Sequence, residues 1–167
     1  AKAVLISIRP EWVEKILGGE KTLEVRKTRP NMETPFKVYI YCTAGNLSYE
    51  ANNGMMCNIS GGKLVVGEFA CDRVETIKAT EPYGIYDVDD DFVAQTGLVG
   101  GALWDYGKGA TLYGWHISKL EIYDTPKELP QFRKCCGTQD CDKCQFWENT
   151  GEYAGCLTSE ERRLNRA

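Results

Sequence analysis

The sequence predicts an α+β domain built around a curved, mostly antiparallel sheet, and three observations carry this prediction. Apolar residues alternate with polar ones in several short stretches, which is typical of strands with one buried face. One segment near the N-terminus instead carries the spacing of an amphipathic helix, and a second short helix is expected later in the chain. Gly67 lies inside the longest predicted strand, and glycine there indicates a bend or bulge that curves a sheet.

The N-terminal elements are a strand followed by a helix. The apolar run at 3–8 predicts the strand, and Pro10 is well placed in the first turn of the helix. Four apolar residues then recur at helical spacing: Trp12, Val13, Ile16 and Leu17. Gly18 and Gly19 end this helix, because glycine accepts the left-handed conformation common at helix ends.

The middle of the chain predicts two further strands joined by a long loop. The stretch 36–42 alternates apolar and polar residues, and 63–77 is long for a single strand, so the bend at Gly67 is expected inside it. The segment 43–62 between them is rich in Gly, Asn and Ser, which predicts a loop.

A short helix and a late strand complete the domain. The helix is expected around 89–96, and its run of aspartates is typical of a helix start. The strand covers 113–124, where the alternation changes phase near Ser118 and Lys119. A bulge at that point would restore the alternation.

Charge and composition restrict the function. The net charge of −4 argues against a protein that coats duplex nucleic acid through bulk charge. The first 30 residues nevertheless hold seven Lys or Arg against four Glu, so a local basic site is possible. No apolar run approaches the roughly 18 residues of a membrane span, and no secretory signal is recognisable. We therefore expect a cytoplasmic protein without membrane contact.

Charged residues crowd one predicted strand, in the stretch GEKTLEVRK. Leu23 and Val25 take the core face, which leaves Glu24 and Arg26 together on the other face, roughly 6.5 Å apart. Lys21 enters from the preceding turn. Two interpretations are open: a surface patch of ion pairs that contributes little stability, or a polar site for an anionic or amide-bearing ligand.

The same stretch resembles the GxKxxExR motif of the ASCH domain family. The flanks SIRPEWVEKIL and LYGWHISKLEIYDTPKEL are similar to the phage and bacterial branch of that family, so the resemblance covers residues 3 to about 129. It implies a small PUA-like β-barrel with flanking short helices, and RNA or modified-nucleotide recognition as the general function. We accordingly expect an ASCH domain at 1–130 and a Cys-rich tail at 131–167.

The resemblance also implies a ligand cleft at the mouth of the barrel, containing Lys21, Glu24 and Arg26. Chemistry and position add Arg9, which follows the first strand and would approach the cleft from one side. This set favours binding of a nucleotide, with cations for phosphate and a carboxylate for base or sugar.

Two aromatic residues are candidates for stacking on a base, Tyr106 and Trp115. Either could instead be a core residue. His116 follows Trp115 in the strand, so the two side chains point to opposite faces. A structural histidine with a satisfied hydrogen bond and a titrating histidine both remain open for His116.

Three functions are compatible with these residues. We favour a monomeric module that binds RNA or a modified nucleotide. The second is a hydrolase that uses Lys21 and Glu24, because some ASCH proteins resemble N4-acetylcytidine amidohydrolases and others ribonucleases. The amidohydrolase branch, however, has Thr where this chain has Glu24, and that carboxylate should hold Lys21 protonated. The third is a protein-interaction module in transcription regulation.

The tail holds five of the eight cysteines. Four of them give the spacing C-x4-C-x2-C-x11-C, namely Cys136, Cys141, Cys144 and Cys156, with Cys135 as an alternative first ligand. Four thiolates suit tetrahedral zinc in a closed structural site. Reduced thiols without metal, a disulfide or redox pair, and a distant likeness to plant-type iron–sulfur spacing are the alternatives.

Overall fold

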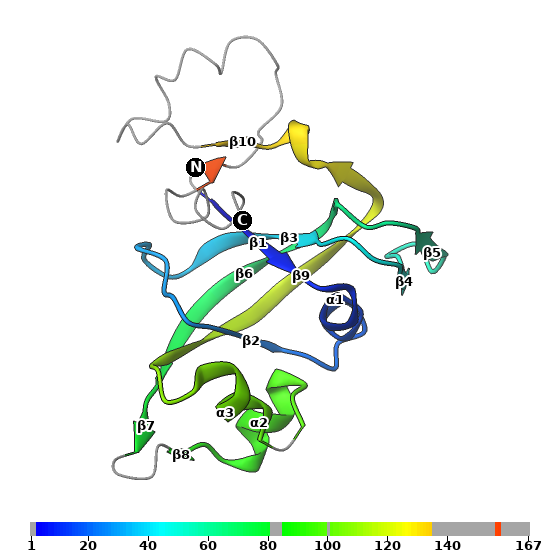
Figure 1. The fold of residues 1–167 in the computed structure, drawn as a ribbon. Helices are drawn as coiled ribbons and strands as arrows, with labels where there is room; N and C mark the ends of the chain where they lie inside the picture. Colours follow the sequence, from blue (N-terminus) through cyan, green and yellow to red (C-terminus); the bar gives the residue numbers. More distant parts are fainter. Residues whose placement is uncertain (1–2, 81–84, 100, 135–155, 158–167) are drawn as a thin grey trace, which may run out of the picture.

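The computed structural model describes residues 3–80, 85–99, 101–134 and 156–157, and its centre is one five-stranded sheet (Figure 1). The strand order is β1-β3-β6-β9-β2. Their bounds are β1 Ala3–Ile8, β3 Phe36–Cys42, β6 Leu64–Ile77, β9 Leu112–Glu128 and β2 Leu23–Arg26. Within this sheet, β1 and β3 pair in parallel, and the other neighbours are antiparallel. The predicted α+β class is therefore confirmed.

Short elements surround this sheet. The helices are α1 Pro10–Leu17, α2 Asp90–Thr96, α3 Ala102–Gly107 and the 3-10 turn η1 Leu129–Gln131. The two-stranded pairs are β4 Leu47–Glu50 with β5 Met56–Ile59, β7 Ala79–Thr80 with β8 Ile85–Tyr86, and β10 Arg133–Lys134 with β11 Cys156–Leu157. No helix in the described ranges is long and apolar enough to span a membrane.

Helix α1 confirms the N-terminal prediction. Arg9 is its extended N-cap and Pro10 occupies the first turn, where a missing N–H costs nothing. The backbone N–H of Gly18 donates to Glu14 O at 2.8 Å, and Gly19 follows with a φ of 78°. Val13, on the inner face, is completely buried. The helix thus packs its apolar face on the sheet and presents its N-terminus to the end of β1.

Both predicted bulges are present and curve the two longest strands. The register between β6 and β9 shifts between Val65 and Gly67. A second shift falls where Glu68 pairs with Glu121 and Ala70 with Ser118, so β9 carries an extra residue there. Bulges of this kind increase local twist and bend a strand. They let the sheet coil round its own core.

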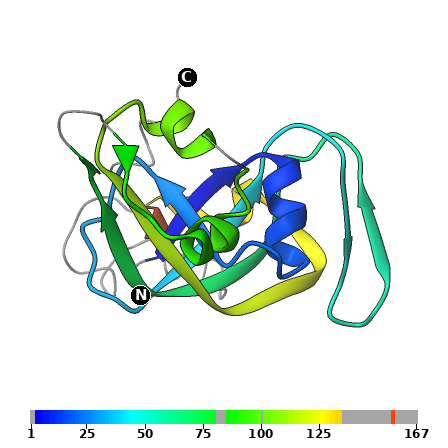
Figure 2. The same cartoon turned by 90° about the horizontal axis from the view of Figure 1, so that it is seen from below.

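The sheet does not close into the predicted PUA-like β-barrel. Within the described chain, β1 and β2 each pair with one strand only and remain edges. We call the space between these two edges the seam; Figure 2 shows the coiled sheet from below. The Arg26 side chain bridges it, because Nη2 donates to the carbonyl of Ser7 at 2.8 Å. A side chain, not a backbone ladder, therefore joins the two edges.

The segment predicted as a loop at 43–62 contains a hairpin, β4 with β5, which projects from the body of the protein (Figure 2). Leu47 and Tyr49 alternate with exposed residues and are buried in the main core near α1. Their alternation was obscured by the surrounding Gly and Asn residues. The prediction of an irregular loop was wrong for these strands.

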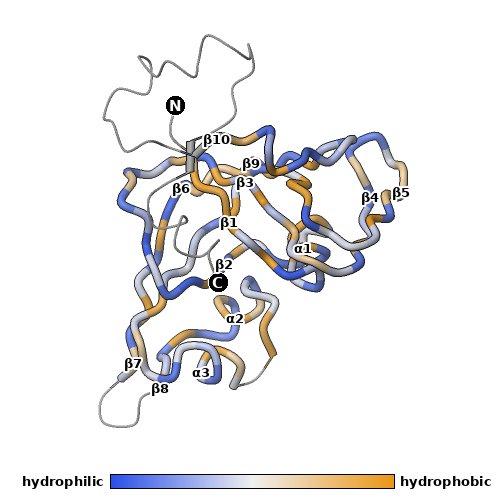
Figure 3. Tube along the Cα trace, turned by 45° about the horizontal axis from the view of Figure 1, so that its top comes forward, coloured by the Kyte–Doolittle hydropathy of each residue, from blue (hydrophilic) through white to orange (hydrophobic). Residues whose placement is uncertain are grey.

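Buried hydrophobic residues form three clusters, and Figure 3 marks the hydrophobic positions along the chain in orange. The main core lies inside the curve of the sheet, under α1, with Val38 and Ile40 completely buried. A second cluster joins β2 to α2 and α3 through Leu23 and Phe92. A third lies on the outer face of the sheet around Tyr39. The helices α2 and α3 therefore belong to the folded body and face β2.

One outer-face contact gives the stability of the fold a pH dependence. Burial of Glu68 opposes ionisation, but hydrogen bonds from Lys37 and Tyr123 outweigh it and lower the pKa of Glu68 below 4.5. A carboxyl with a lowered folded pKa stabilises the protein above its unfolded value and loses this contribution as the pH falls through the folded pKa. In urea unfolding, the wild type should therefore have a larger free energy of unfolding than Glu68→Gln at pH 7, and this difference should become smaller below about pH 4.5. A difference that is unchanged at pH 3 would contradict this.

A candidate ligand cavity at the open seam

A cavity of about 430 Å³ opens along the seam. Its walls come from the end of β1, the start of α1, strand β2 and helix α3. Polar and aromatic side chains dominate the lining: Arg9, Trp12, Lys21, Glu24, Arg26, Asp105 and Tyr106. Lys21, Glu24 and Arg26 of the ASCH-like motif thus lie together at the seam, among elements far apart in the sequence.

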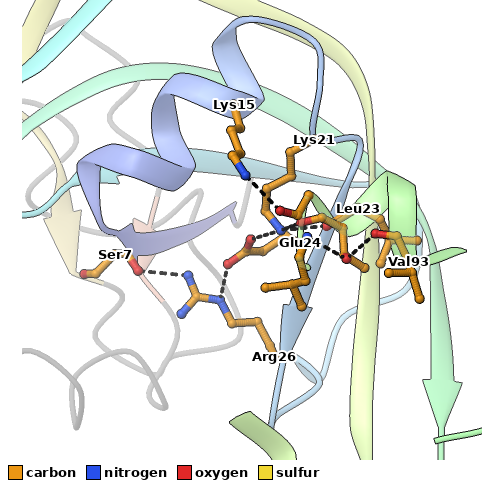
Figure 4. Close-up of polar contacts among 10 residues, drawn as sticks. Ser7, Lys15, Lys21, Leu23, Glu24, Arg26 and Val93 are labelled. Atoms are coloured by element: carbon orange, nitrogen blue, oxygen red, sulfur yellow. Dashed lines mark hydrogen bonds and ion pairs between the residues drawn. The ribbon is translucent and has the colours of Figure 1, made fainter. Parts of the chain in front are cut away.

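Lys21 is the most deeply buried charged residue of this cavity, with 4 % of its surface exposed. Its Nζ donates to Leu23 O at 2.9 Å and to Thr96 O at 2.7 Å (Figure 4). It also lies 3.1 Å from Glu24 Oε2. An ammonium has three N–H groups, so these three acceptors use all of them.

Two lysines hold the C-terminus of α2 against the motif. Lys21 bonds the carbonyl of Thr96, and Lys15 of α1 donates to Gly97 O at 2.9 Å. The last carbonyls of a helix have no partner inside the helix and carry partial negative charge. The backbone N–H of Thr22 adds a bond to Gln95 O at 2.9 Å. Lys21 is therefore a structural link between β2 and α2 as well as a wall of the cavity.

Glu24 lies between the two cations of the motif, with 7 % of its surface exposed. Its Oε1 is 2.9 Å from Arg26 Nε, while Oε2 faces Lys21 (Figure 4). The Arg26 contact is an ion pair whose Nε–H is not aligned as a hydrogen bond. These side chains form a buried charged triad, not the surface patch of ion pairs that was one interpretation of the sequence.

The charge state of Lys21 reflects two opposed effects. Burial lowers the pKa of Lys21 below 10.5, and the neighbouring Glu24 carboxylate raises it without cancelling the burial. Glu24 thus favours the protonated lysine, as expected, but the burial of Lys21 has the larger effect on its pKa. Because Nζ faces three acceptors, the ammonium fits this position better than the neutral amine.

The structure brings the motif together with Arg9 and Tyr106. Arg9 lines the cavity with an exposed side chain, and its Nε lies 3.1 Å from Glu11 Oε1. Tyr106 of α3 also lines the cavity and is partly exposed, with Lys27 Nζ 5.0 Å from the ring centroid. Both therefore lie where a ligand in the cavity could touch them.

Trp115 does not line the cavity. It is buried in the main core, where its ring meets Phe36 edge-to-face at 5.7 Å. The neighbouring His116 points outward and its Nδ1 lies 2.6 Å from Asp72 Oδ1, which is the satisfied hydrogen bond that the structural interpretation expects. Strand alternation predicted the opposite faces. We therefore correct the expectation that Trp115 stacks on a ligand.

Among the polar and aromatic residues of the cavity lining, sequence reasoning missed three: Ser7, Trp12 and Asp105. Trp12 was assigned to the apolar face of α1, yet it is only partly buried and Lys15 Nζ lies 4.9 Å from its ring centroid. Its place one residue before the fully buried Val13 is a signal that it lies at the edge of that face. Nothing in the sequence marks Asp105.

The predicted zinc ligands fall largely outside the described residues. Cys136, Cys141 and Cys144 lie there, as does the alternative Cys135, whereas Cys156 is described as the first residue of β11. Among the residues that the structure describes, no group of His, Cys, Asp and Glu could hold a metal ion. Structural zinc in the tail stays a prediction.

Comparisons with known proteins establish the fold. No family model matches the sequence, and neither does any curated protein. The crystal structure of ASCH from Zymomonas mobilis is similar with a TM-score of 0.57 at 17 % identity, covering 99 % of this chain and 94 % of that chain. A structure of a mutant of the same protein gives 0.53 at 16 % identity, covering 99 % and 97 %. The ASCH resemblance is thus confirmed at the level of the fold.

Proposed function

From the premise of an ASCH-type fold, we propose that the seam cavity binds one nucleotide unit of single-stranded RNA, or a modified nucleotide. One observation carries the proposal: two aromatic rings and two guanidinium groups line the same cavity as two carboxylates. These are Trp12 and Tyr106, Arg9 and Arg26, and Glu24 and Asp105. Single-stranded bases are recognised by this combination of stacking, phosphate contacts and polar contacts to base edges.

Each group has a role that its environment permits. Tyr106 and Trp12 offer faces for a base, and the exposed Arg9 is the group best placed for a phosphate. Arg26 uses Nη2 on Ser7 and Nε on Glu24, and among the described residues its Nη1 has no hydrogen-bond partner. The Glu24 oxygens keep free lone pairs for a base amino group, since each can accept more than one bond.

A hydrolase is the second candidate, favoured by the burial that lowers the pKa of Lys21 beside Glu24. Such a pair can transfer protons when a lysine can give up its proton near neutral pH. All three Nζ donors of Lys21, however, are directed at Leu23, Thr96 and Glu24. Proton transfer to a ligand would require one of these bonds to break. Binding without turnover is therefore the better supported function.

The test compares two aromatic substitutions on the same short helix. Tyr106→Ala should weaken binding of a labelled single-stranded RNA about 10- to 100-fold, since stacking on an aromatic ring contributes about 1–3 kcal/mol per base. Trp104→Ala is the matched control, because Trp104 is exposed on α3 but does not line the cavity. Fluorescence anisotropy with several short RNAs and free nucleosides, including N4-acetylcytidine, measures both variants. Equal affinities for the two variants would overturn the proposal.

Two readouts separate the remaining functions. Arg9→Ala should reduce the slope of log K against log salt by about one if Arg9 contacts a phosphate. Release of acetate or RNA cleavage that is lost in Lys21→Met would instead identify a hydrolase. Binding of neither RNA nor nucleosides would leave the protein-interaction module.

A further inference from the structure

A second cavity, of about 630 Å³, lies on the other side of α3. It is bounded by β8, α2 and α3, at the end of the molecule where Figure 1 shows the two helices. Apolar side chains make up most of its lining: Ile85, Val88, Val93, Leu98, Leu103 and Trp104. We call this cavity the apolar groove. It shares only Leu98 with the lining of the seam cavity.

The groove exposes large hydrophobic residues that a folded domain usually buries. Ile85 is 63 % exposed and Trp104 45 %, and Val99, next to the lining residue Leu98, is 82 % exposed. Figure 3 shows the hydrophobic colour within and between α2 and α3. Exposed apolar residues that gather beside a cavity are typical of a surface that binds another molecule.

The chain segment that forms the groove carries acidic residues and no basic ones. Between Lys78 and Lys108 the chain has six Asp or Glu and no Lys or Arg. Asp90 lines the groove, and Asp87 and Asp91 beside it are exposed. A neutral or acidic occupant would leave these carboxylates uncompensated, whereas a basic one would be attracted to them.

We propose that the apolar groove docks a segment of a protein partner that carries apolar side chains flanked by Lys or Arg. The apolar lining would take the hydrophobic side chains, and Asp87, Asp90 and Asp91 would pair with the basic ones. The same carboxylates disfavour RNA as the occupant, because like charges repel. This surface is distinct from the seam cavity and its partner is of another class.

Helix α3 lets the two surfaces be tested separately. Trp104 and Tyr106 are two residues apart, a spacing at which helical side chains do not share a face. Trp104 lines the groove and Tyr106 the seam cavity. A variant of one should therefore leave the other surface intact. Failure of the docking proposal would thus be distinguishable from failure of the nucleotide proposal.

The experiment uses a short fluorescein-labelled peptide of Leu and Lys in an amphipathic helical pattern, titrated into the full chain. We expect saturable binding that Ile85→Lys and Trp104→Ala each weaken at least about 10-fold, as is common for central interface residues. Ile85→Lys also places a like charge against the peptide, and its exposed position spares the fold. Met55→Lys, an equally exposed apolar residue on the hairpin, and Tyr106→Ala are the controls that should bind as wild type.

Three results would overturn the proposal. One is an equal loss of peptide affinity in Met55→Lys, which would indicate a general effect of the added positive charge. Another is equal binding of the peptide with Glu in place of Lys. The third is self-association of the protein that Ile85→Lys abolishes in sedimentation, which would make a second copy the occupant. If Trp104→Ala lowers the melting temperature, Ile85→Lys alone decides the outcome.

Discussion

Replacing Glu24 by alanine is expected to lower the free energy of unfolding by about 3–5 kcal/mol, the usual effect of breaking a buried ion pair by removing one partner. The carboxylate lies between Lys21 and Arg26, and both Lys21 and Glu24 are nearly inaccessible to water. Without it, the Lys21 ammonium keeps two carbonyl partners but no countercharge. Urea unfolding followed by circular dichroism measures the change.

Glu75→Ala is the matched control, because Glu75 also forms an ion pair, with Arg73 at 3.0 Å, on the exposed surface. Its effect should stay below about 1 kcal/mol. The pH dependence gives a further check. A lysine whose folded pKa lies below 10.5 binds fewer protons when folded, so stability rises with pH from the folded pKa up to 10.5. Without Glu24, which raises this pKa, the folded pKa of Lys21 falls further, so the variant gains more stability than wild type as the pH rises. The difference in free energy of unfolding between wild type and Glu24→Ala should therefore become smaller in alkaline buffer, and a constant difference would contradict the argument.

Gly67→Ala is expected to destabilise the protein by about 1–3 kcal/mol, the range found when atoms are forced into a packed interior. A Cβ at Gly67 would lie 2.5 Å from Glu121 O and 3.5 Å from Ile122 Cα, both backbone atoms of the neighbouring strand. Backbone atoms cannot rotate away as the end of a side chain can. The strands β6 and β9 would have to separate at their bulge.

Thermal or urea unfolding of Gly67→Ala tests this, with Gly18→Ala as its control. Gly18 has right-handed helical dihedrals, and its nearest contact would be Glu14 O at 3.1 Å. Alanine there should change the stability by less than about 1 kcal/mol, in part because it restricts the unfolded chain. Equal losses of stability at the two positions would show that the close approach of β6 and β9 does not restrict the side chain at position 67.

Features set by neighbouring residues could be predicted from the sequence. Helix α1 follows from apolar spacing and its Pro and Gly ends, and the bulges at Gly67 and near Ser118 follow from a glycine and a change of phase. The open seam could not be predicted in this way. Whether two edge strands meet depends on the curvature of the whole sheet and on what fills the space between them.

The same distinction applies to the candidate site: arrangements within one strand could be predicted, and contacts between distant elements could not. Alternation placed Glu24 and Arg26 together, because both belong to one short strand. The burial of Lys21 depends on the carbonyl of Thr96, 75 residues away, which no local pattern indicates. Alternation also separated Trp115 from His116, but which of the two turns inward is decided by the core that Phe36 helps to form.

The seam has a consequence for how the protein moves. The central pair β6 and β9 can stay intact while an edge strand detaches, because among the described strands β1 and β2 each pair with one strand and are joined to each other through Arg26. Local opening of this kind requires less free energy than global unfolding and sets the rate of amide hydrogen exchange at the edges. Since Arg26 also lines the cavity, any molecule that fixes its guanidinium would slow that exchange in both strands, although Ser7 and Arg26 are 19 residues apart in the sequence.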